Sequence, residues 1–167
     1  MLKLPGALAR FISTAGGIGY WPCCPGTWGT VPGVLLFFSV DRLLSLLANP
    51  PLHIPLHLIL FISLLLLTFK ATAQALDFFS GSDPSQVVID EIAGVWLALL
   101  ILRLFLAAPL ELFIYPLAFL LFRLFDIVKP PPVYQLQALP GSVGVIFDDL
   151  FAGILAAALL LILFVVF

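Results

Sequence analysis

Long apolar segments constrain this chain most. From Leu150 to Phe167 the sequence has no polar side chain, and residues 56–69 include no Asp, Glu, Lys or Arg. A helix that crosses a bilayer needs about 20 predominantly apolar residues. The chain is 63% hydrophobic and 10% charged, whereas soluble domains are about 45–50% apolar and about 25% charged. The sequence therefore predicts an all-α, polytopic integral membrane protein, because helices satisfy their own backbone hydrogen bonds in lipid.

Polar or Pro- and Gly-rich stretches divide the apolar sequence into five segments. We expect transmembrane helices at about 31–47, 56–69, 87–106, 110–128 and 148–167. Residues 1–30 begin with a short apolar stretch between Lys3 and Arg10, and we expect an N-terminal segment at the membrane interface. The polar residues 71–86 are predicted to form a loop or a short surface helix. The length fits one membrane-embedded domain over residues 1–167.

A polar ridge ends the fourth predicted span. Arg123, Asp126 and Lys129 recur at every third position, and residues three apart are neighbours on a helix. Pro130–Pro132 then stop the helix. Interfacial anchoring explains the two basic residues but not the carboxylate between them. Ionisable residues at a membrane mark a functional site by default.

Two acidic pairs stand where apolar segments begin. They are Asp90-Glu91 and Asp148-Asp149, followed one turn later by Gly94 and Gly153. The helix dipole favours carboxylates at such positions, but two adjacent ones exceed what capping requires. The glycines would let another helix approach closely.

The predicted topology brings these acidic residues together. The third span begins, the fourth ends and the fifth begins at the same membrane face. Five of the seven Lys and Arg residues fall on that face, so the positive-inside rule makes it cytoplasmic. The five are Lys3, Arg10, Lys70, Arg123 and Lys129, whereas Arg42 and Arg103 fall on the other face.

Clustered carboxylates repel one another unless a proton or a cation intervenes. Oxygen ligands without His or Cys favour Mg²⁺, Ca²⁺ or Mn²⁺, and Lys and Arg beside such an ion suit a phosphate group. We therefore expect metal-assisted phosphoryl transfer or hydrolysis on a phospholipid whose acyl chains stay in the membrane. The candidate metal ligands are Asp90, Glu91, Asp126, Asp148 and Asp149, and the candidate catalytic residues are Asp90, Glu91, Asp126 and Asp149.

Several features allow two interpretations. Arg123 either holds phosphate or pairs with Asp126. Pro25–Thr30 is either a turn with Thr30 as the helix N-cap or a loop that faces phosphate, and the residues alone favour the first. His53 and His57 have no acidic residue nearby in sequence, so they are interpreted as interfacial rather than as a ligand pair.

Other classes of protein fit less well. The formal charge of −2 and the lack of a basic tract argue against a nucleic-acid partner. A small cation carrier would need a path through the membrane midplane, where the predicted spans carry almost no charge. A non-catalytic membrane subunit would not need the acidic positions. The adjacent Cys23 and Cys24 predict no disulfide framework.

Four segments resemble the phosphatidylglycerophosphatase A family in its order and spacing. They are Pro25–Thr30, Val88–Gly94, Phe122–Pro132 and Gly141–Gly153. The resemblance implies a Mg²⁺-dependent phosphatase of the bacterial inner (cytoplasmic) membrane that converts phosphatidylglycerophosphate to phosphatidylglycerol and inorganic phosphate. It also implies that the Pro25–Thr30 segment belongs to the site. The residues expected to bind the substrate phosphate are then Lys129, Arg123, Thr27 and Thr30.

Overall fold

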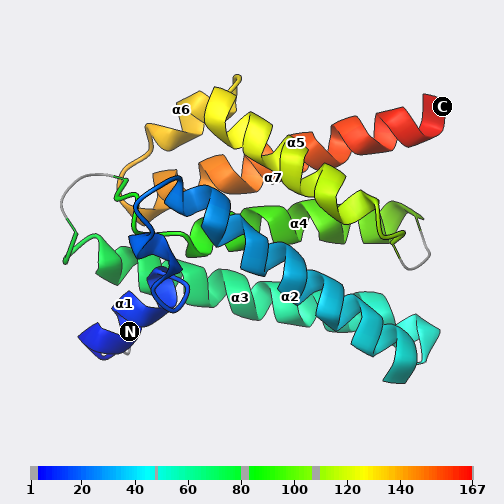
Figure 1. The fold of residues 1–167 in the computed structure, drawn as a ribbon, viewed down its shortest axis with the longest axis horizontal. Helices are drawn as coiled ribbons and strands as arrows, with labels where there is room; N and C mark the ends of the chain where they lie inside the picture. Colours follow the sequence, from blue (N-terminus) through cyan, green and yellow to red (C-terminus); the bar gives the residue numbers. More distant parts are fainter. Residues whose placement is uncertain (1–3, 48, 80–82, 107–109, 167) are drawn as a thin grey trace.

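The computed structural model describes residues 4–47, 49–79, 83–106 and 110–166, and this part of the chain contains helices and no strand. The elements are α1 (Gly6–Ser13), η1 (Ile18–Tyr20), α2 (Pro25–Leu47), η2 (Pro50–Leu52), α3 (His53–Ala75), α4 (Ile89–Leu106), α5 (Ile114–Val128), α6 (Val133–Gln137) and α7 (Ser142–Val166). The predicted all-α class is therefore confirmed. The bundle is elongated, and α2, α3, α4, α5 and α7 run along its length (Figure 1).

Helix α4 lies in the middle of the bundle (Figure 1) and contacts α2, α3, α5 and α7. Most of its residues are buried, which its sequence explains because apolar side chains occur on every side of the helix. Trp96 and Leu99 pack there with Phe37 of α2, Phe122 of α5 and Leu160 of α7. The position of α4 thus determines how α2, α5 and α7 are arranged around it.

Three segments are long and apolar enough to cross a membrane: α2, η2 with α3, and α7. Helix α4 has 18 residues, three of them charged, and α5 has only 15 residues. Their assignment as further spans remains a prediction, as does the interfacial placement of α1. The outward faces of the bundle are apolar, since Leu46, Ile59, Leu66 and Leu120 are all more than half exposed. Such a continuous apolar surface is expected of a protein surrounded by lipid.

Three helices begin earlier than the sequence suggested. Helix α3 begins at His53 instead of about residue 56 and continues to Ala75, so the first residues of the expected 71–86 loop are helical. Helix α2 begins at Pro25, so the expected Pro25–Thr30 loop is helical, and Thr30 is not an N-cap. Proline suits this first position, because its missing N–H would have no intrahelical partner anyway. Helix α7 begins at Ser142, so Asp148 and Asp149 lie in its second turn instead of at its entry. Helix α5 ends at Val128, as the following prolines predicted.

A close crossing of α4 and α7 depends on two glycines. A Cβ on Gly153 would lie 2.3 Å from the carbonyl oxygen of Gly94. A Cβ on Gly94 would lie 2.7 Å from the carbonyl oxygen of Asp149. The predicted role of these glycines is confirmed, since no side chain would fit between the two backbones. The crossing brings the start of α4 next to the second turn of α7, and hence holds the two acidic pairs side by side.

A buried polar network lies toward the opposite end of the bundle. Asp41 of α2 accepts hydrogen bonds from Arg103 Nε (2.8 Å) and Tyr115 Oη (3.2 Å), and His57 Nε2 lies 3.3 Å away. Arg103 also contacts His53. The expectation that no acidic partner is near was therefore wrong for His57, and the interfacial placement of the two histidines stays a prediction. Asp41 is 16 residues from His57, and only the packing of α2 against α3 brings them together.

Candidate active site

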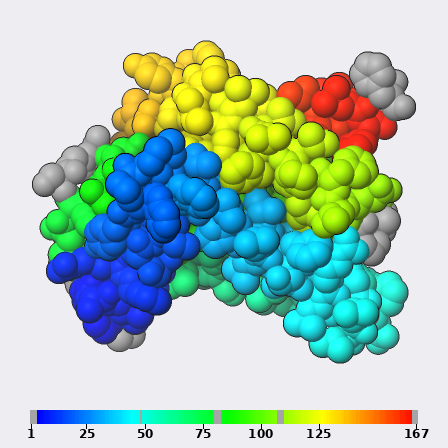
Figure 2. All heavy atoms as spheres, viewed as in Figure 1, coloured from blue at the N-terminus to red at the C-terminus, as the bar shows by residue number. Residues whose placement is uncertain are grey.

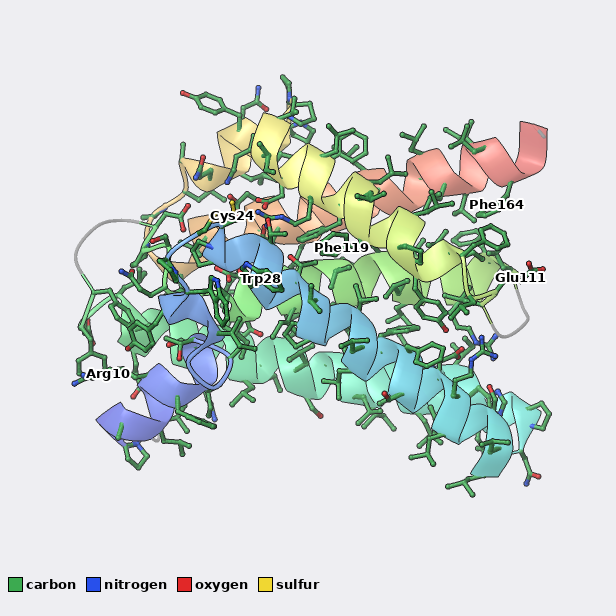
Figure 3. The ribbon with its side chains drawn as sticks, viewed as in Figure 1. Arg10, Cys24, Trp28, Glu111, Phe119 and Phe164 are labelled. Atoms are coloured by element: carbon green, nitrogen blue, oxygen red, sulfur yellow. The ribbon has the colours of Figure 1, made fainter. Side chains whose placement is uncertain are left out.

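One cavity of about 440 Å³ lies where the start of α2, the starts of α4 and α7 and the end of α5 meet. All five acidic residues predicted for the site line it, together with Arg123, Lys129 and Thr27. Cys24, labelled in Figure 3, marks this end of the bundle and also lines the cavity. The sequence-predicted convergence of the acidic segments is thus present in the fold.

Three carboxylates form a compact group at the bottom of this cavity. One oxygen each of Asp90, Glu91 and Asp149 lie within 4.8 Å of one another. Asp90 and Asp149 are only 3% and 5% exposed, so water cannot screen their repulsion effectively. The second carboxylate oxygen of Glu91, Oε2, is buried and has no hydrogen-bond partner among the described residues. A buried acceptor of this kind needs a partner, and a hard cation would supply one to all three carboxylates.

Lys129 is a basic residue of the cavity lining. Its Nζ donates to Asp148 Oδ2 at 2.5 Å and lies 3.9 Å from Asp126 Oδ1. Burial lowers the pKa of Lys129, but the hydrogen bond to Asp148 and the nearby carboxylates outweigh it, and the pKa is raised. The ammonium therefore stays charged. Asp148 is thereby engaged with Lys129 and stands apart from the three-carboxylate group.

Arg123 links the polar ridge to the carboxylates. Its Nη1 lies 2.5 Å from Asp126 Oδ2 and 4.0 Å from Glu91 Oε1. The predicted neighbour relation along the α5 ridge is confirmed, and so is the salt bridge to Asp126. Its Nε is buried and unpaired within the described part of the chain, so Arg123 retains a donor that an anionic ligand would satisfy.

At Gly26, the start of α2 lies against the side-chain ends of Glu91 and Arg123. A Cβ on Gly26 would lie 2.3 Å from Glu91 Oε1 and 3.0 Å from Arg123 Nη1. The first backbone N–H groups of a helix lack intrahelical partners and suit an anion. Thr27 lines the cavity, whereas the buried Thr30 donates to Gly26 O at 2.8 Å and does not line it.

Sequence reasoning missed some lining residues. Asp83 and Ser85 reach the cavity from the segment before α4, and Asp83 accepts a hydrogen bond from Gln137 at 3.0 Å. Their segment carries only a general turn composition, which does not indicate where a loop folds back. Gly26 and Cys24 also contribute to the cavity, and Gly26 was identifiable as part of a Pro-Gly-Thr motif.

The site thus combines two kinds of surface around one space. The three grouped carboxylates suit a metal cation and can accept a proton. The two basic side chains and the N-terminus of α2 suit a phosphate group. The cavity lies in an otherwise apolar bundle, so a ligand with a phosphate head and apolar tails would match both environments. This arrangement fits the hydrolysis of a phosphate ester on a lipid.

Comparison with known proteins gives the same class of activity. Residues 11–164 match the family described as Phosphatidylglycerophosphatase A. A Bacteroides thetaiotaomicron protein named "Putative phosphatidylinositol-3-phosphatase" is 37% identical, with 92% of this chain and 91% of that protein covered. A Haemophilus influenzae protein named phosphatidylglycerophosphatase A is 32% identical, with 84% of this chain and 78% of that protein covered.

An Escherichia coli phosphatidylglycerophosphatase A is 27% identical, with 86% of this chain and 76% of that protein covered. No solved structure matches the chain significantly. The family match extends over nearly the whole sequence and includes every helix that lines the cavity. The chain therefore belongs to the phosphatidylglycerophosphatase A family.

Proposed function

We propose that this enzyme hydrolyses phosphatidylglycerophosphate to phosphatidylglycerol and inorganic phosphate. The observation that carries the proposal is the meeting of Asp90, Glu91 and Asp149 with Arg123 and Lys129 around one cavity. A phosphate monoester needs positive groups for its oxygens and a carboxylate that can accept a proton. The basic side chains and the carboxylates line the same cavity. The family to which the chain belongs is named for this activity.

Mg²⁺ is the cofactor that we propose for the site. The fit rests on an all-oxygen donor set and on the unpaired, buried Oε2 of Glu91. Asp90, Glu91 and Asp149 would hold the ion, and Asp126 borders the same cavity. When bound, Mg²⁺ would supply positive charge that stabilises the phosphoryl group during its transfer to water.

The side chains of the protein would bind and orient the substrate. Lys129 and Arg123 would hold the phosphate oxygens, with the first N–H groups of α2 and the Thr27 hydroxyl beside them. Asp126 lies between the two basic side chains, 2.5 Å from Arg123 and 3.9 Å from Lys129, and would keep both directed at the phosphate. One of the three grouped carboxylates would accept the proton of the water that attacks phosphorus. As the bond between phosphorus and the glycerol oxygen breaks, a proton would pass to that oxygen, which leaves as the hydroxyl of phosphatidylglycerol.

We also propose that the site faces the cytoplasm of a bacterium, in a chain with five membrane spans. The long helices α2, α3 and α7 would cross the membrane, and α4 and α5 would cross beside them. The excess of Lys and Arg toward the site end supports this orientation. The substrate would present its phosphate to the cavity and keep its acyl chains in the inner leaflet.

Phosphate release by the purified protein tests the reaction and the cofactor together. Phosphatidylglycerophosphate in detergent micelles should yield inorganic phosphate with Mg²⁺, none with EDTA, and phosphate again when Mg²⁺ is restored. Full activity in the chelator would refute the metal assignment. No release under any divalent cation would refute the proposed substrate.

A second substrate must be included in the same assay. The Bacteroides relative is named for phosphatidylinositol 3-phosphate hydrolysis, and this lipid also carries a phosphate monoester. The site contacts described above address the phosphate, so the two head groups must be compared directly. A higher kcat/KM on phosphatidylglycerophosphate supports the proposal, and the reverse order would assign the inositol lipid instead.

A further inference from the structure

A second hollow, of about 450 Å³, lies between α2 and α5 on the outer side of the bundle. Its walls are formed by Val31, Val34, Leu35 and Phe38 of α2 and by Leu112, Tyr115, Pro116 and Phe119 of the α5 region. We call it the α2–α5 groove. The two helices lie side by side on the face shown in Figure 2, and Phe119 is labelled between them in Figure 3. Leu35 is 58% exposed and Leu112 is 69% exposed, so the groove is open sideways to the surroundings.

The groove continues the line of the phosphate site along both helices. On α2, Thr27 lines the site, and Val31, Val34 and Phe38 follow it at four, seven and eleven residues. Such positions form one stripe on a helix.

Helix α5 runs in the opposite direction and shows the mirrored spacing. Arg123 lines the site, and Phe119 and Pro116 precede it at four and seven residues. If the head of a ligand binds Arg123 and Lys129, the rest of the ligand can therefore extend along the groove between the two helices.

The length of the stripe corresponds to one lipid leaflet. From Thr27 to Phe38 the helix rises about 16 Å at about 1.5 Å per residue. One leaflet contributes about 15 Å to a hydrocarbon core of about 30 Å. A chain anchored by a head group at the cavity would reach the end of the groove near the middle of the membrane.

Toward the far end of the groove, the polar groups beside its lining are paired with other partners. Tyr115 contributes its ring to the groove while its hydroxyl donates to buried Asp41. The Phe38 ring packs edge-on against Tyr115 at a centroid distance of 5.1 Å. Arg42 stacks over Phe38 and donates to the carbonyl of Leu110 at 2.7 Å, which ties α2 to the segment before α5. These contacts give the groove a fixed end and leave its lining apolar.

We propose that the α2–α5 groove holds one acyl chain of the phospholipid substrate while its phosphate occupies the site. The inference rests on the proposed lipid phosphatase activity and adds a substrate-binding surface to it. Lipid tails are as apolar as the groove, so little affinity is expected from burial alone. The groove contributes by orienting the glycerol backbone, and errors of about 1 Å in such positioning cost up to about a hundredfold in rate.

Chain-length selectivity tests the proposal. The assay compares kcat/KM on dioleoyl phosphatidylglycerophosphate with that on the dihexanoyl form, whose chains are too short to fill the groove. Val34→Phe and Leu35→Trp fill the groove, and Leu36→Trp is the matched control. Leu36 is adjacent, 50% exposed and outside the groove lining. We expect both groove variants to lower the long-to-short ratio about tenfold or more, with the dihexanoyl rate and the control unchanged. An unchanged ratio in both groove variants, or an equal fall in the control, would overturn the proposal.

Crosslinking gives a readout that does not depend on turnover. A phosphatidylglycerophosphate analogue with a photoreactive diazirine at the end of one chain is bound in EDTA, and a phosphate-free analogue serves as the bulk-lipid control. We expect crosslinks of the phosphate form to concentrate on α2 and α5 around Phe38 and Tyr115 and to disappear in Val34→Phe. Crosslinks spread equally over the apolar surface for both analogues would refute the groove, even if phosphate release confirms the proposed reaction. Failure of phosphate release with localised crosslinks would instead refute only the reaction.

Discussion

Single residues in this site differ in role although they share a charge. Asp90, Glu91 and Asp149 face one another, whereas Asp148 pairs with Lys129 and Asp126 pairs with Arg123. The sequence identified all five carboxylates but could not divide them, because the division depends on which helix faces which. The contact of Gly26 with Glu91 could not be predicted from the sequence either, because it forms only when α2 packs against α4.

Removing one carboxylate charge from the group should reduce turnover without unfolding the protein. We expect Asp149→Asn and Asp126→Asn each to lower kcat about a hundredfold or more, about 3 kcal/mol, because a charge in the site is removed. The protein should still fold, because asparagine has nearly the same volume as aspartate. Phosphate release and the amount of membrane-inserted protein are measured together. Glu111→Gln, at the other end of the bundle (Figure 3), is the control and should keep normal turnover. Near-normal turnover of both site variants would leave the carboxylates with a structural role only.

The two threonines at the start of α2 should separate binding from stability. Thr27 lines the cavity, while Thr30 is buried and hydrogen-bonded to Gly26 O. Thr27→Ala should raise KM several-fold with little change in melting temperature. Thr30→Ala should lower the free energy of unfolding by about 1 kcal/mol and leave KM near normal. A raised KM in Thr30→Ala alone would restore Thr30 as a phosphate contact.

Helix ends were the least predictable elements, and their errors have physical causes. Pro25-Gly26 and Gly141 to Gly144 have loop composition, but tertiary packing overrides weak local preferences. The helices therefore extend by a turn or more at these starts. The end of α5 was predictable, because three consecutive prolines cannot continue a helix. Close helix contact was also predictable from Gly94 and Gly153, since glycine is the residue that permits it.

The α4–α7 crossing should therefore control activity from outside the cavity. Neither Gly94 nor Gly153 lines the site, yet Gly153→Ala must push the two helices apart. We expect a destabilisation of about 1–3 kcal/mol together with a loss of turnover, because the Asp90–Asp149 spacing would change. Ala158→Val on the exposed side of α7 adds more volume and should change neither quantity. Full activity of Gly153→Ala would show that the crossing does not set the carboxylate geometry.

At the scale of the whole molecule, two polar centres occupy opposite parts of an apolar bundle. The sequence predicted the first from its motifs and topology. The second, around Asp41, was missed because its members come from four helices and each looks isolated in sequence. Charges buried away from water need such partners. The network joins α2, α3, α4 and α5 at the end away from the cavity.

Loss of Asp41 should affect stability more than chemistry. Asp41→Leu leaves Arg103, which is only 4% exposed, without its carboxylate, and breaking such a buried pair costs about 3–5 kcal/mol. The double variant Asp41→Leu/Arg103→Met removes both charges and should recover much of this loss. Thermal unfolding measures the stability of both variants, and folded protein should keep its kcat on dihexanoyl substrate. Equal stability of the single and double variants would contradict a coupled ion pair.

The membrane side on which Glu111 lies tests the number of membrane spans. Glu111, shortly before α5, lies at the opposite end of the bundle from Cys24 (Figure 3). If α4 and α5 both cross the membrane, Glu111 is outside and shares its face with Asn49. Glu111 could stay on the cytoplasmic face only if α4 and α5 did not pack along α2 as they do in this structure, where Arg42 contacts Leu110. Helix α4 would be about 27 Å long and α5 about 22 Å, so both approach the hydrocarbon thickness of about 30 Å.

Cysteine labelling distinguishes the two arrangements. The exposed Cys23 and Cys24 are first replaced by serine, and single cysteines are then placed at Asn49, Glu111 and Ala138. We expect an impermeant maleimide to label Asn49→Cys and Glu111→Cys from outside, and Ala138→Cys only after the membrane is opened. The reason is the excess of Lys and Arg at the site end, which the positive-inside rule retains in the cytoplasm. Protection of Glu111→Cys with labelling of Asn49→Cys would establish three spans, and the reverse pattern at all three positions would place the phosphate site outside the cell.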